Sequence, residues 1–356
     1  MSNELTLDKA DGHTPTVGEP LLQLSGLQKH FPVMDGFLFK RQVGAVHAVD
    51  GVDLTVHANE SVGLVGESGC GKSTLGRLVT RLYEPTAGTI TYAGQDISHA
   101  NRKQLAPIRS EIQMIFQDPY SSLNPRQTVG AIIGAPMEIN GINPPGGVQK
   151  KVQELLETVG LNPEHYNRFP HEFSGGQRQR IGVARALSLS PKLIVADEPV
   201  SALDVSIQAQ VVNLLQQLQK DLGIAFLFIA HDLAIVRHFS QRVAVMYLGK
   251  IVEIADRKSL YESPRHPYTH ALLSAVPEAD PDDNRERIRL VGDVPSPINP
   301  PSGCRFRTRC WKAQDKCATE EPPLVQLSGN VDGHLTACHF PEEGGLAAVP
   351  EQRDAE

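Results

Sequence analysis

Short apolar segments rich in β-branched residues recur along the chain and alternate with segments whose apolar positions follow helical spacing. The apolar segments read VDLTV, SVGLV, IQMIF, KLIVA and IAFLFIA. This alternation is typical of an α/β fold with a mainly parallel sheet. Residues 193–196 and 224–230 are continuously apolar, which indicates central strands buried on both faces. Val52, Leu54 and Val56 instead alternate with polar residues, which predicts a half-exposed strand at an antiparallel edge.

Three segments have the i, i+3, i+4 spacing of an amphipathic helix, and we predict helices there. Their apolar positions are Leu75, Leu78, Val79 and Leu82; Val152, Leu155, Leu156 and Val159; and Ile207, Val211, Leu214, Leu215 and Leu218. The later segment VAVMYLGKIVEIA predicts a β-hairpin that turns at Gly249 and Lys250.

Composition marks the ends of these patterned regions. Residues 1–20 and 341–356 are polar, and we expect solvated arms there. Residues 277–301 contain six prolines and the charged stretch DPDDNRERIR, which predicts an extended linker. The length of 356 residues predicts about two domains and is ample for a buried core.

Charge and hydropathy exclude several classes of protein. The chain has 34 Lys and Arg residues against 41 Asp and Glu residues, a net charge of −7, so it lacks the electrostatic signature of a protein that binds bulk nucleic acid or anionic lipid. The longest near-apolar run has nine residues, about half of a membrane span. The polar, acidic start differs from a signal peptide, so we expect a cytosolic protein.

A glycine-rich segment, GESGCGKS, follows the apolar strand SVGLV and precedes the first predicted helix. It fits the phosphate-binding pattern G-x4-G-K-S/T in the structural context that the pattern requires. Backbone amides of such a loop point at phosphate oxygens, Lys72 supplies a charge for the β- and γ-phosphates, and Ser73 can ligate Mg²⁺. The candidate nucleotide-binding residues are Gly66, Glu67, Ser68, Gly69, Cys70, Gly71, Lys72, Ser73 and Thr74.

Two further motifs suit phosphate chemistry. Asp197 and Glu198 end an apolar strand, where Asp197 would hold Mg²⁺ and Glu198 would face the attacking water. Acidic strand ends are common by chance, so this pair gains its meaning from the other motifs. One of these is Ser174-Gly175-Gly176-Gln177, which opens a helix with a hydroxyl and glycine amides and thus predicts a second anion site.

With these motifs in order, residues 21–257 resemble the ATP-binding cassette (ABC) ATPases. The matching residues are Phe31 for the aromatic that stacks on adenine, Gln117 for the glutamine loop, Ser174, Gly175, Gly176 and Gln177 for the signature motif, Asp204 for the loop at the dimer seam, and His231 for the switch histidine. The resemblance implies that the signature of one subunit closes over ATP held by another. It also implies ATP and Mg²⁺ as cofactors, with Ser73, Gln117 and Asp197 at the magnesium ion and Glu198, His231 and Gln117 as catalytic residues. Phe173 replaces the leucine of the usual LSGGQ signature and leaves the serine and both glycines intact.

The implied fold is a P-loop (RecA-like) ABC ATPase core with an antiparallel β edge and an α-helical subdomain at about residues 118–180. A small cysteine-containing C-terminal extension follows at residues 258–340. Within it the segments RHPYT, PSPINPPSGCRFRTRC and TACHF resemble the extension of ATPases that serve dipeptide and oligopeptide importers.

This second resemblance implies an ATPase subunit that powers a peptide importer by ATP-driven closure of two cassettes. The implied partners are a second ABC ATPase subunit, commonly a different chain, two transmembrane permease subunits and, indirectly, an extracytoplasmic solute-binding protein, with no nucleic acid. The subunit would be peripheral, at the cytoplasmic face of the inner (plasma) membrane. An importer of nickel or another small solute is the alternative within the subfamily. A non-transport ABC ATPase in translation or DNA repair is less favoured, because such proteins usually carry two cassettes or a long coiled coil.

Four of the five cysteines, Cys304, Cys310, Cys317 and Cys338, lie in the extension. Four thiolates suit either a 4Fe-4S cluster or tetrahedral Zn²⁺. None of their spacings gives the two-to-four-residue knuckle usual for structural zinc, which favours the cluster, and similar importer tails are associated with such clusters. Reduced cysteines without metal, or a disulfide formed on handling, stay open. The cysteines lie far in sequence from the nucleotide motifs, so we expect the site to act as a structural staple.

Overall fold

The computed structural model describes residues 18–36, 41–276, 287–327 and 333–343. In this part of the chain the larger sheet has eight strands in the order β11-β12-β10-β9-β3-β8-β7-β6. Their bounds are β3 Ser61–Val65, β6 Ile112–Ile115, β7 Leu193–Asp197, β8 Ala225–Ile229, β9 Arg242–Tyr247, β10 Lys250–Asp256, β11 Val325–Gln326 and β12 Leu335–Thr336. Strands β6, β7, β8, β3 and β9 are parallel to one another, and β10, β12 and β11 continue the sheet through antiparallel pairs. The predicted α/β fold is therefore confirmed.

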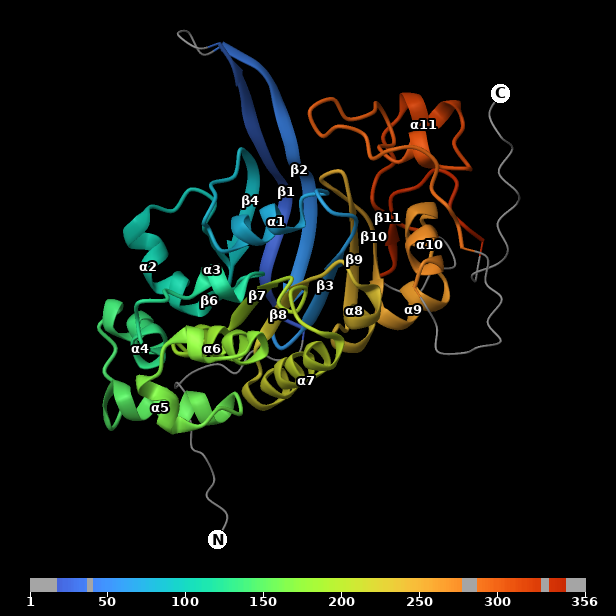
Figure 1. Ribbon diagram of the computed structural model, residues 1–356. Coiled ribbons are helices and arrows are strands. Elements are labelled where there is room, and N and C mark those ends of the chain that lie inside the picture. Colours follow the sequence, from blue (N-terminus) through green and yellow to red (C-terminus); the bar gives the residue numbers. More distant parts are fainter. Residues whose placement is uncertain (1–17, 37–40, 277–286, 328–332, 344–356) are drawn as a thin grey trace, which may run out of the picture.

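The described residues form a second, four-stranded antiparallel sheet in the order β2-β1-β4-β5. Its strands are β1 Pro20–Asp35, β2 Arg41–His57, β4 Ala87–Tyr92 and β5 Gln95–Asp96. Val52 and Val56 are fully buried and Leu54 is nearly so, which confirms the strand predicted from their alternation. Figure 1 shows β1 and β2 extending as a long hairpin beyond the body of the molecule.

Helices cover the central sheet. Their bounds are α1 Lys72–Val79, α2 Arg102–Glu111, α3 Pro119–Ser122, α4 Val129–Ile139, α5 Gly147–Thr158, α6 Gly175–Leu187, α7 Val205–Leu222, α8 Leu233–Phe239, α9 Arg257–Glu262, α10 Pro267–Ser274 and α11 Asp315–Thr319. Short 3-10 turns are η1 Pro163–Asn167, η2 Pro170–Glu172 and η3 Arg307–Arg309. None of the helices in the described ranges is long and apolar enough to cross a membrane.

The three predicted helices correspond to α1, α5 and α7, with small corrections at their ends. Leu82 lies beyond α1 and is 54% exposed, because the chain leaves the helix at Thr80. The predicted late hairpin is β9–β10, but it turns at Leu248 and Gly249, one residue earlier than expected. Both turn residues have positive φ, 43° at Leu248 and 81° at Gly249, and only the glycine adopts such a value without strain.

Two apolar cores lie on either side of the central sheet. One joins the small sheet to α1 and includes Leu22, Val52 and Leu75, all fully buried. The other lies under the helices on the opposite face and includes Val211 of α7 and Tyr268 of α10. Each fully buried aliphatic side chain contributes about 1.5–3 kcal/mol, so these two cores fix the sheet that carries the phosphate motifs.

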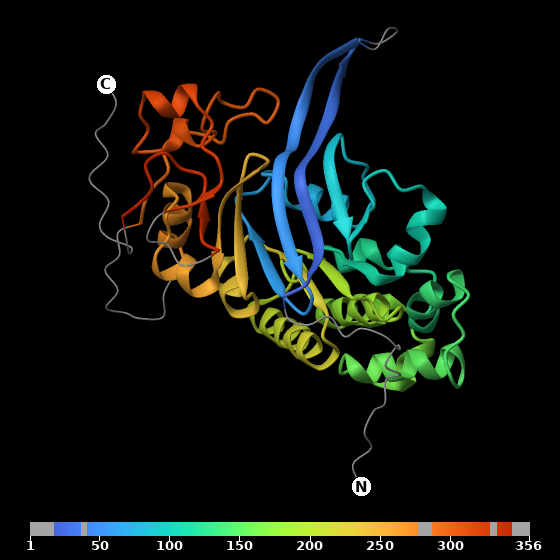
Figure 2. The same ribbon diagram turned by 180° about the vertical axis from the view of Figure 1, so that it is seen from behind.

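The C-terminal extension (residues 258–340) docks at the β9–β10 end of the sheet, away from α4 and α5 at the opposite end (Figures 1 and 2). Phe306 of the extension is 1% exposed and belongs to the core of the helical face. The extension is thus held by docking onto the main domain.

Parts of the segments expected as arms and linker make contacts with the rest of the described chain. Residues 1–17, 277–286 and 344–356 lie outside the described residues, whereas Pro20 already begins β1. The Glu342 amide donates to the carbonyl of Arg265 at 2.8 Å. In the expected linker, the carbonyl of Pro297 accepts from the His47 amide of β2 at 2.9 Å, so this part packs against the hairpin.

Candidate nucleotide-binding site

The phosphate loop, residues 66–73, joins β3 to α1. A Cβ on Gly66 would lie 2.1 Å from the carbonyl oxygen of Met246, and one on Gly71 would lie 2.0 Å from that of Ala48. Both positions also have positive φ, 154° and 109°, so the loop needs glycine for its close approach to the neighbouring backbone. Lys72 begins α1 and is buried, with its Nζ donating to the carbonyls of Gly66 at 2.7 Å and Glu67 at 3.0 Å.

Ser73 and Asp197 meet beside this loop. The Ser73 hydroxyl donates to Oδ1 of Asp197 at 2.8 Å, although the residues lie on α1 and at the end of β7. Asp197 is 2% exposed, and its burial raises its carboxyl pKa while the bond from Ser73 lowers it, leaving the pKa above its usual value. A hydroxyl and a carboxylate side by side are oxygen ligands of the type that Mg²⁺ takes, so the residues fit the expected magnesium ion.

Three predicted residues converge where parallel strands β6, β7 and β8 end. Gln117 Nε2 donates to Oε2 of Glu198 at 2.9 Å, and Nδ1 of His231 lies 3.6 Å from the same oxygen. Glu198 has a φ of 44°, unusual for a residue with a side chain and frequent at functional sites. The carboxyl ends of parallel strands meet at one edge of the sheet, which explains how residues from three motifs come together.

The signature residues 174–177 form the N-terminus of helix α6. Ser174 caps α6: its hydroxyl accepts from the Gln177 amide at 3.4 Å, and the Gln177 side chain accepts from the Ser174 amide at 3.0 Å. A Cβ on Gly176 would lie 2.4 Å from Ile207, so glycine lets α6 pack closely on α7, which begins after Asp204. Within the described residues, no hydrogen bond or ion pair joins this turn to the phosphate loop of the same chain.

Phe31 lies on β1 opposite Val46. Its ring meets Tyr83 edge to face with centroids 5.5 Å apart, and Nζ of Lys29 lies 5.1 Å from the ring centroid. The ring is half-buried in the hairpin, so part of its surface is exposed and available to a flat ligand.

The structure adds two residues that sequence reasoning missed. Arg309 of the extension makes a two-pronged ion pair with the carboxylate of Glu67 in the phosphate loop, at 2.7 and 3.1 Å. The Tyr268 hydroxyl accepts from the Glu67 amide at 2.8 Å. The extension thus contacts the phosphate loop although its residues lie far from that loop in sequence. No local pattern signals this contact, because 242 positions separate Glu67 from Arg309.

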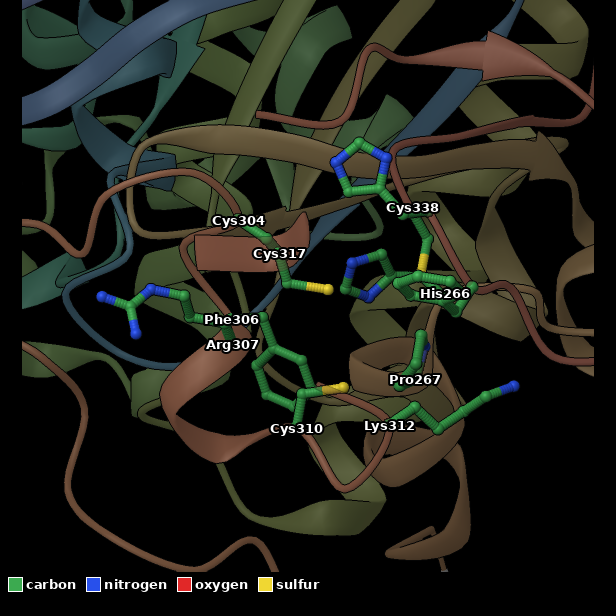
Figure 3. A pocket seen from close by; sticks show the side chains of 11 residues that line it. His266, Pro267, Cys304, Phe306, Arg307, Cys310, Lys312, Cys317 and Cys338 are labelled. Carbon is green, nitrogen blue, oxygen red and sulfur yellow. The ribbon is translucent and has the colours of Figure 1, made fainter. Parts of the chain in front are cut away.

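The four cysteines of the extension line one pocket, together with His266 and Phe306 (Figure 3). Burial raises the pKa of the Cys304 thiol and raises those of Cys310 and Cys338 to about 12. In the described part of the chain, the one group that places three metal-binding atoms within 4.8 Å of one another is His30, His47 and Asp50, so no three of these sulfurs are that close. This pocket is defined here as the cysteine pocket.

Comparison with known proteins agrees with the geometry. Residues 49–201 match the family described as ABC transporter, and residues 252–317 match the oligopeptide/dipeptide transporter C-terminal region. The oligopeptide transport ATP-binding protein AppF of Bacillus subtilis is 52% identical over 325 residues, which cover 90% of this chain and 98% of that protein. The chain belongs to the ABC ATPases. The dipeptide transport ATP-binding protein DppF of Haemophilus influenzae is 50% identical over 319 residues, covering 90% of this chain and 96% of DppF.

Solved structures support the same family. The ATP-binding cassette MJ0796, solved as a dimer after hydrolysis with ADP and Pi, matches with a TM-score of 0.58 and 27% identity. The match covers 66% of this chain and 98% of MJ0796. In this ABC ATPase the signature departure, Phe173, is 4% exposed and packs edge to face on His165 with ring centroids 5.2 Å apart. The larger apolar side chain is thus accommodated in the core.

Proposed function

We propose that this ABC ATPase is the ATP-hydrolysing subunit of an importer for dipeptides or oligopeptides. The observation that carries the proposal is the extent of the sequence similarity. Relatives named for oligopeptide and dipeptide transport align over 90% of the chain, and the extension matches the C-terminal region of such transporters. Neither relative is named for nickel import or for a role outside transport. We propose domain bounds of 21–257 for the cassette, including the helical subdomain at about 118–180, and 258–340 for the extension.

Catalysis rests on residues that the fold brings to one edge of the sheet. We assign binding of the ATP phosphates to the phosphate loop and to Thr74, and adenine stacking to Phe31. Ser73 and Asp197 would hold Mg²⁺, with Gln117 completing its shell. The magnesium ion would supply charge stabilisation at the phosphates.

Glu198 would accept the proton of the attacking water, because its carboxylate lies at the open end of the strands beside Gln117 and His231. His231 is 59% exposed, which leaves its ring free to reach the γ-phosphate. Gln117 would sense the nucleotide through the same carboxylate and pass its state to the helical subdomain that follows it.

The complete site needs a second cassette. Ser174, Gly175, Gly176 and Gln177 form an anion-binding turn that does not touch its own phosphate loop, so we propose that it closes over ATP on a partner, with Asp204 at the seam. The partner cassette would be a different chain of the same family. Closure and reopening would then move two permease subunits, and a solute-binding protein would deliver peptide on the other side.

The helical subdomain carries candidates for the permease contact. Tyr120 is 60% exposed and Ile139 is 83% exposed, so both side chains are accessible to a partner. Docking there would place the subunit peripherally at the cytoplasmic face of the inner membrane.

We also propose that Cys304, Cys310, Cys317 and Cys338 hold a 4Fe-4S cluster. Their sulfurs line one pocket yet are spread too widely for a single tetrahedral Zn²⁺, whose Zn–S bonds of about 2.3 Å put sulfurs about 3.8 Å apart. Of the basic residues in this segment, Arg307 and Lys312 line the pocket and would offset the charge of thiolates and sulfides. A bound cluster would cross-link the segments that carry the four cysteines. Its iron would also stabilise the thiolate form of these side chains, which burial alone disfavours.

Purification of the tagged chain from membranes tests the transport proposal. We expect two permease subunits and a second cassette to co-purify, and peptide with its binding protein to stimulate ATP hydrolysis in the reconstituted complex. Stimulation by nickel but not by any peptide would refute the substrate class. Absence of permease subunits would refute the transport role.

Anaerobic purification with iron, sulfide and zinc analysis tests the cluster. About four irons and four sulfides per chain are expected, and Cys338→Ser should lower both. Stoichiometric zinc, or folded and active protein without metal, would refute this assignment and leave the ATPase assignment intact.

A further inference from the structure

Two arginines that lie next to a cysteine of the extension pair with acidic residues of the cassette, and one of them contacts the phosphate loop. Arg305, next to Cys304, pairs with Asp50 and donates to the carbonyl of Leu248. Oδ1 of Asp50 in turn lies 2.8 Å from Nε2 of His30, the residue that precedes Phe31. Arg309, next to Cys310, pairs with Glu67 of the phosphate loop.

The Arg309 contact has the geometry of a strong ion pair. Two guanidinium nitrogens face two carboxylate oxygens, which fixes the direction of the Glu67 side chain as well as its distance. The Arg309 side chain is 8% exposed and that of Glu67 is 26% exposed, so solvent screens the pair only partly. Burial alone would lower the pKa of Arg309, but its bonds to Glu67 and Tyr247 raise it, and the guanidinium stays charged.

Glu67 is held at every polar group it has. Its carboxylate is bound by Arg309, its amide donates to Tyr268, and its carbonyl accepts from Nζ of Lys72. Two of these three partners belong to the extension, and the third is the residue assigned to the phosphates. Glu67 therefore supplies one of the two carbonyls that hold Nζ of Lys72, the other being that of Gly66.

Aromatic rings pack behind the extension side of this contact. Tyr268 packs on Tyr247 with ring centroids 4.7 Å apart, and Phe306 lies 5.3 Å from both rings. Tyr247 belongs to β9, next to the Met246 carbonyl against which Gly66 packs. The phosphate loop is thus bounded by the sheet on one side and the extension on the other.

We propose that the extension is a clamp on the nucleotide site, with Arg309 and Tyr268 as positioning residues that hold the phosphate loop in its nucleotide-binding form. Without the clamp, the loop spends less time in that form, and apparent affinity falls by the same fraction. The inference rests on the proposed function for ATP as ligand, but not on the transported solute or on what fills the cysteine pocket.

Isothermal titration of ATP and of ADP into the purified full-length chain tests the clamp. Arg309→Gln should raise both dissociation constants about tenfold, with hydrogen exchange in residues 302–327 close to that of wild type. Lys316→Gln is the matched control, because it removes a cation of the extension that pairs at the surface with Glu320 and not with Glu67. It should leave both constants within twofold.

Two further variants separate positioning from a general structural role. Tyr268→Phe keeps the ring packing and removes the acceptor of the Glu67 amide, and should raise both constants about three- to tenfold. In a Glu67→Ala background, Arg309→Gln should change them less than twofold, since the clamp then has nothing to hold. An equal loss in both backgrounds, or an Arg309→Gln variant that binds as wild type, would overturn the clamp. Failure of the wild-type chain to bind ATP would instead refute the proposed function.

Discussion

Replacement of Glu253 by Gln tests how the extension is anchored. Glu253 lies on β10 with no exposed surface, and its carboxylate accepts from the Arg265 amide at 2.7 Å, the His266 amide at 3.0 Å and Nε2 of His334 at 2.7 Å. These donors belong to the start of α10 and to the strand that enters β12, so a single buried carboxylate joins both parts of the extension to the sheet. Gln keeps the volume of the side chain, but its NH₂ group replaces one carboxylate oxygen. At least one of the three donors then faces another donor and loses its acceptor.

The expected loss follows from these contacts. A buried donor left without an acceptor costs about 1–3 kcal/mol, and the remaining bonds lose their charge assistance, so we expect about 2–4 kcal/mol of local stability to be lost. At 1.4 kcal/mol per factor of ten, hydrogen exchange in residues 258–276 and 333–343 should accelerate about 30- to 700-fold. Glu321→Gln is the control: Glu321 is 56% exposed and pairs with Lys250 at the surface, so its loss should change exchange little. Exchange in Glu253→Gln within threefold of wild type would refute the anchoring role.

Three predictions concern the nucleotide site. Glu198→Gln keeps the bond to Gln117 but cannot take a proton, so hydrolysis by the assembled complex should fall on the order of 10²-fold with ATP still bound; turnover within tenfold of wild type would contradict its role as base. Lys72→Ala removes a charge from the phosphates and should weaken ATP binding to the isolated chain at least about tenfold in a titration, whereas unchanged affinity would speak against it. Ser174→Arg should abolish hydrolysis in the assembled complex without weakening ATP binding to its own phosphate loop; full activity of a strictly monomeric chain would exclude the composite site.

The sequence predicted the central fold because its apolar patterns are local and strong. The continuously apolar segments became β7 and β8, which the central sheet buries on both faces, and the alternating segment became part of β2 in the antiparallel sheet. The errors lie at boundaries. Leu82 continues the helical spacing past the end of α1, and the hairpin turn moved by one residue to accommodate positive φ at Leu248 and Gly249.

Most of the candidate site was also readable from the sequence, since each motif carries its own chemistry in a few adjacent residues. Ser73 and Asp197 were predicted separately, and the parallel sheet brings their side chains within 2.8 Å. The same edge brings Gln117 and His231 to Glu198. The positive φ of Glu198 was not predictable, because it arises from the tertiary turn after β7 and no neighbouring glycine signals it.

The contact between the extension and the phosphate loop could not be predicted from the sequence. Glu67 occupies one of the unspecified positions of the G-x4-G-K-S/T pattern, so the motif itself assigns no task to its side chain. Arg309 reads equally well as one of several cations that offset a charged cysteine site. Their ion pair depends on how the extension packs along β9, through Phe306, Tyr268 and the Glu253 anchor, and this packing is a property of the whole domain. A side chain at a variable motif position therefore becomes informative only with its distant partner, and here the partner connects the cysteine pocket to the residue that positions Lys72.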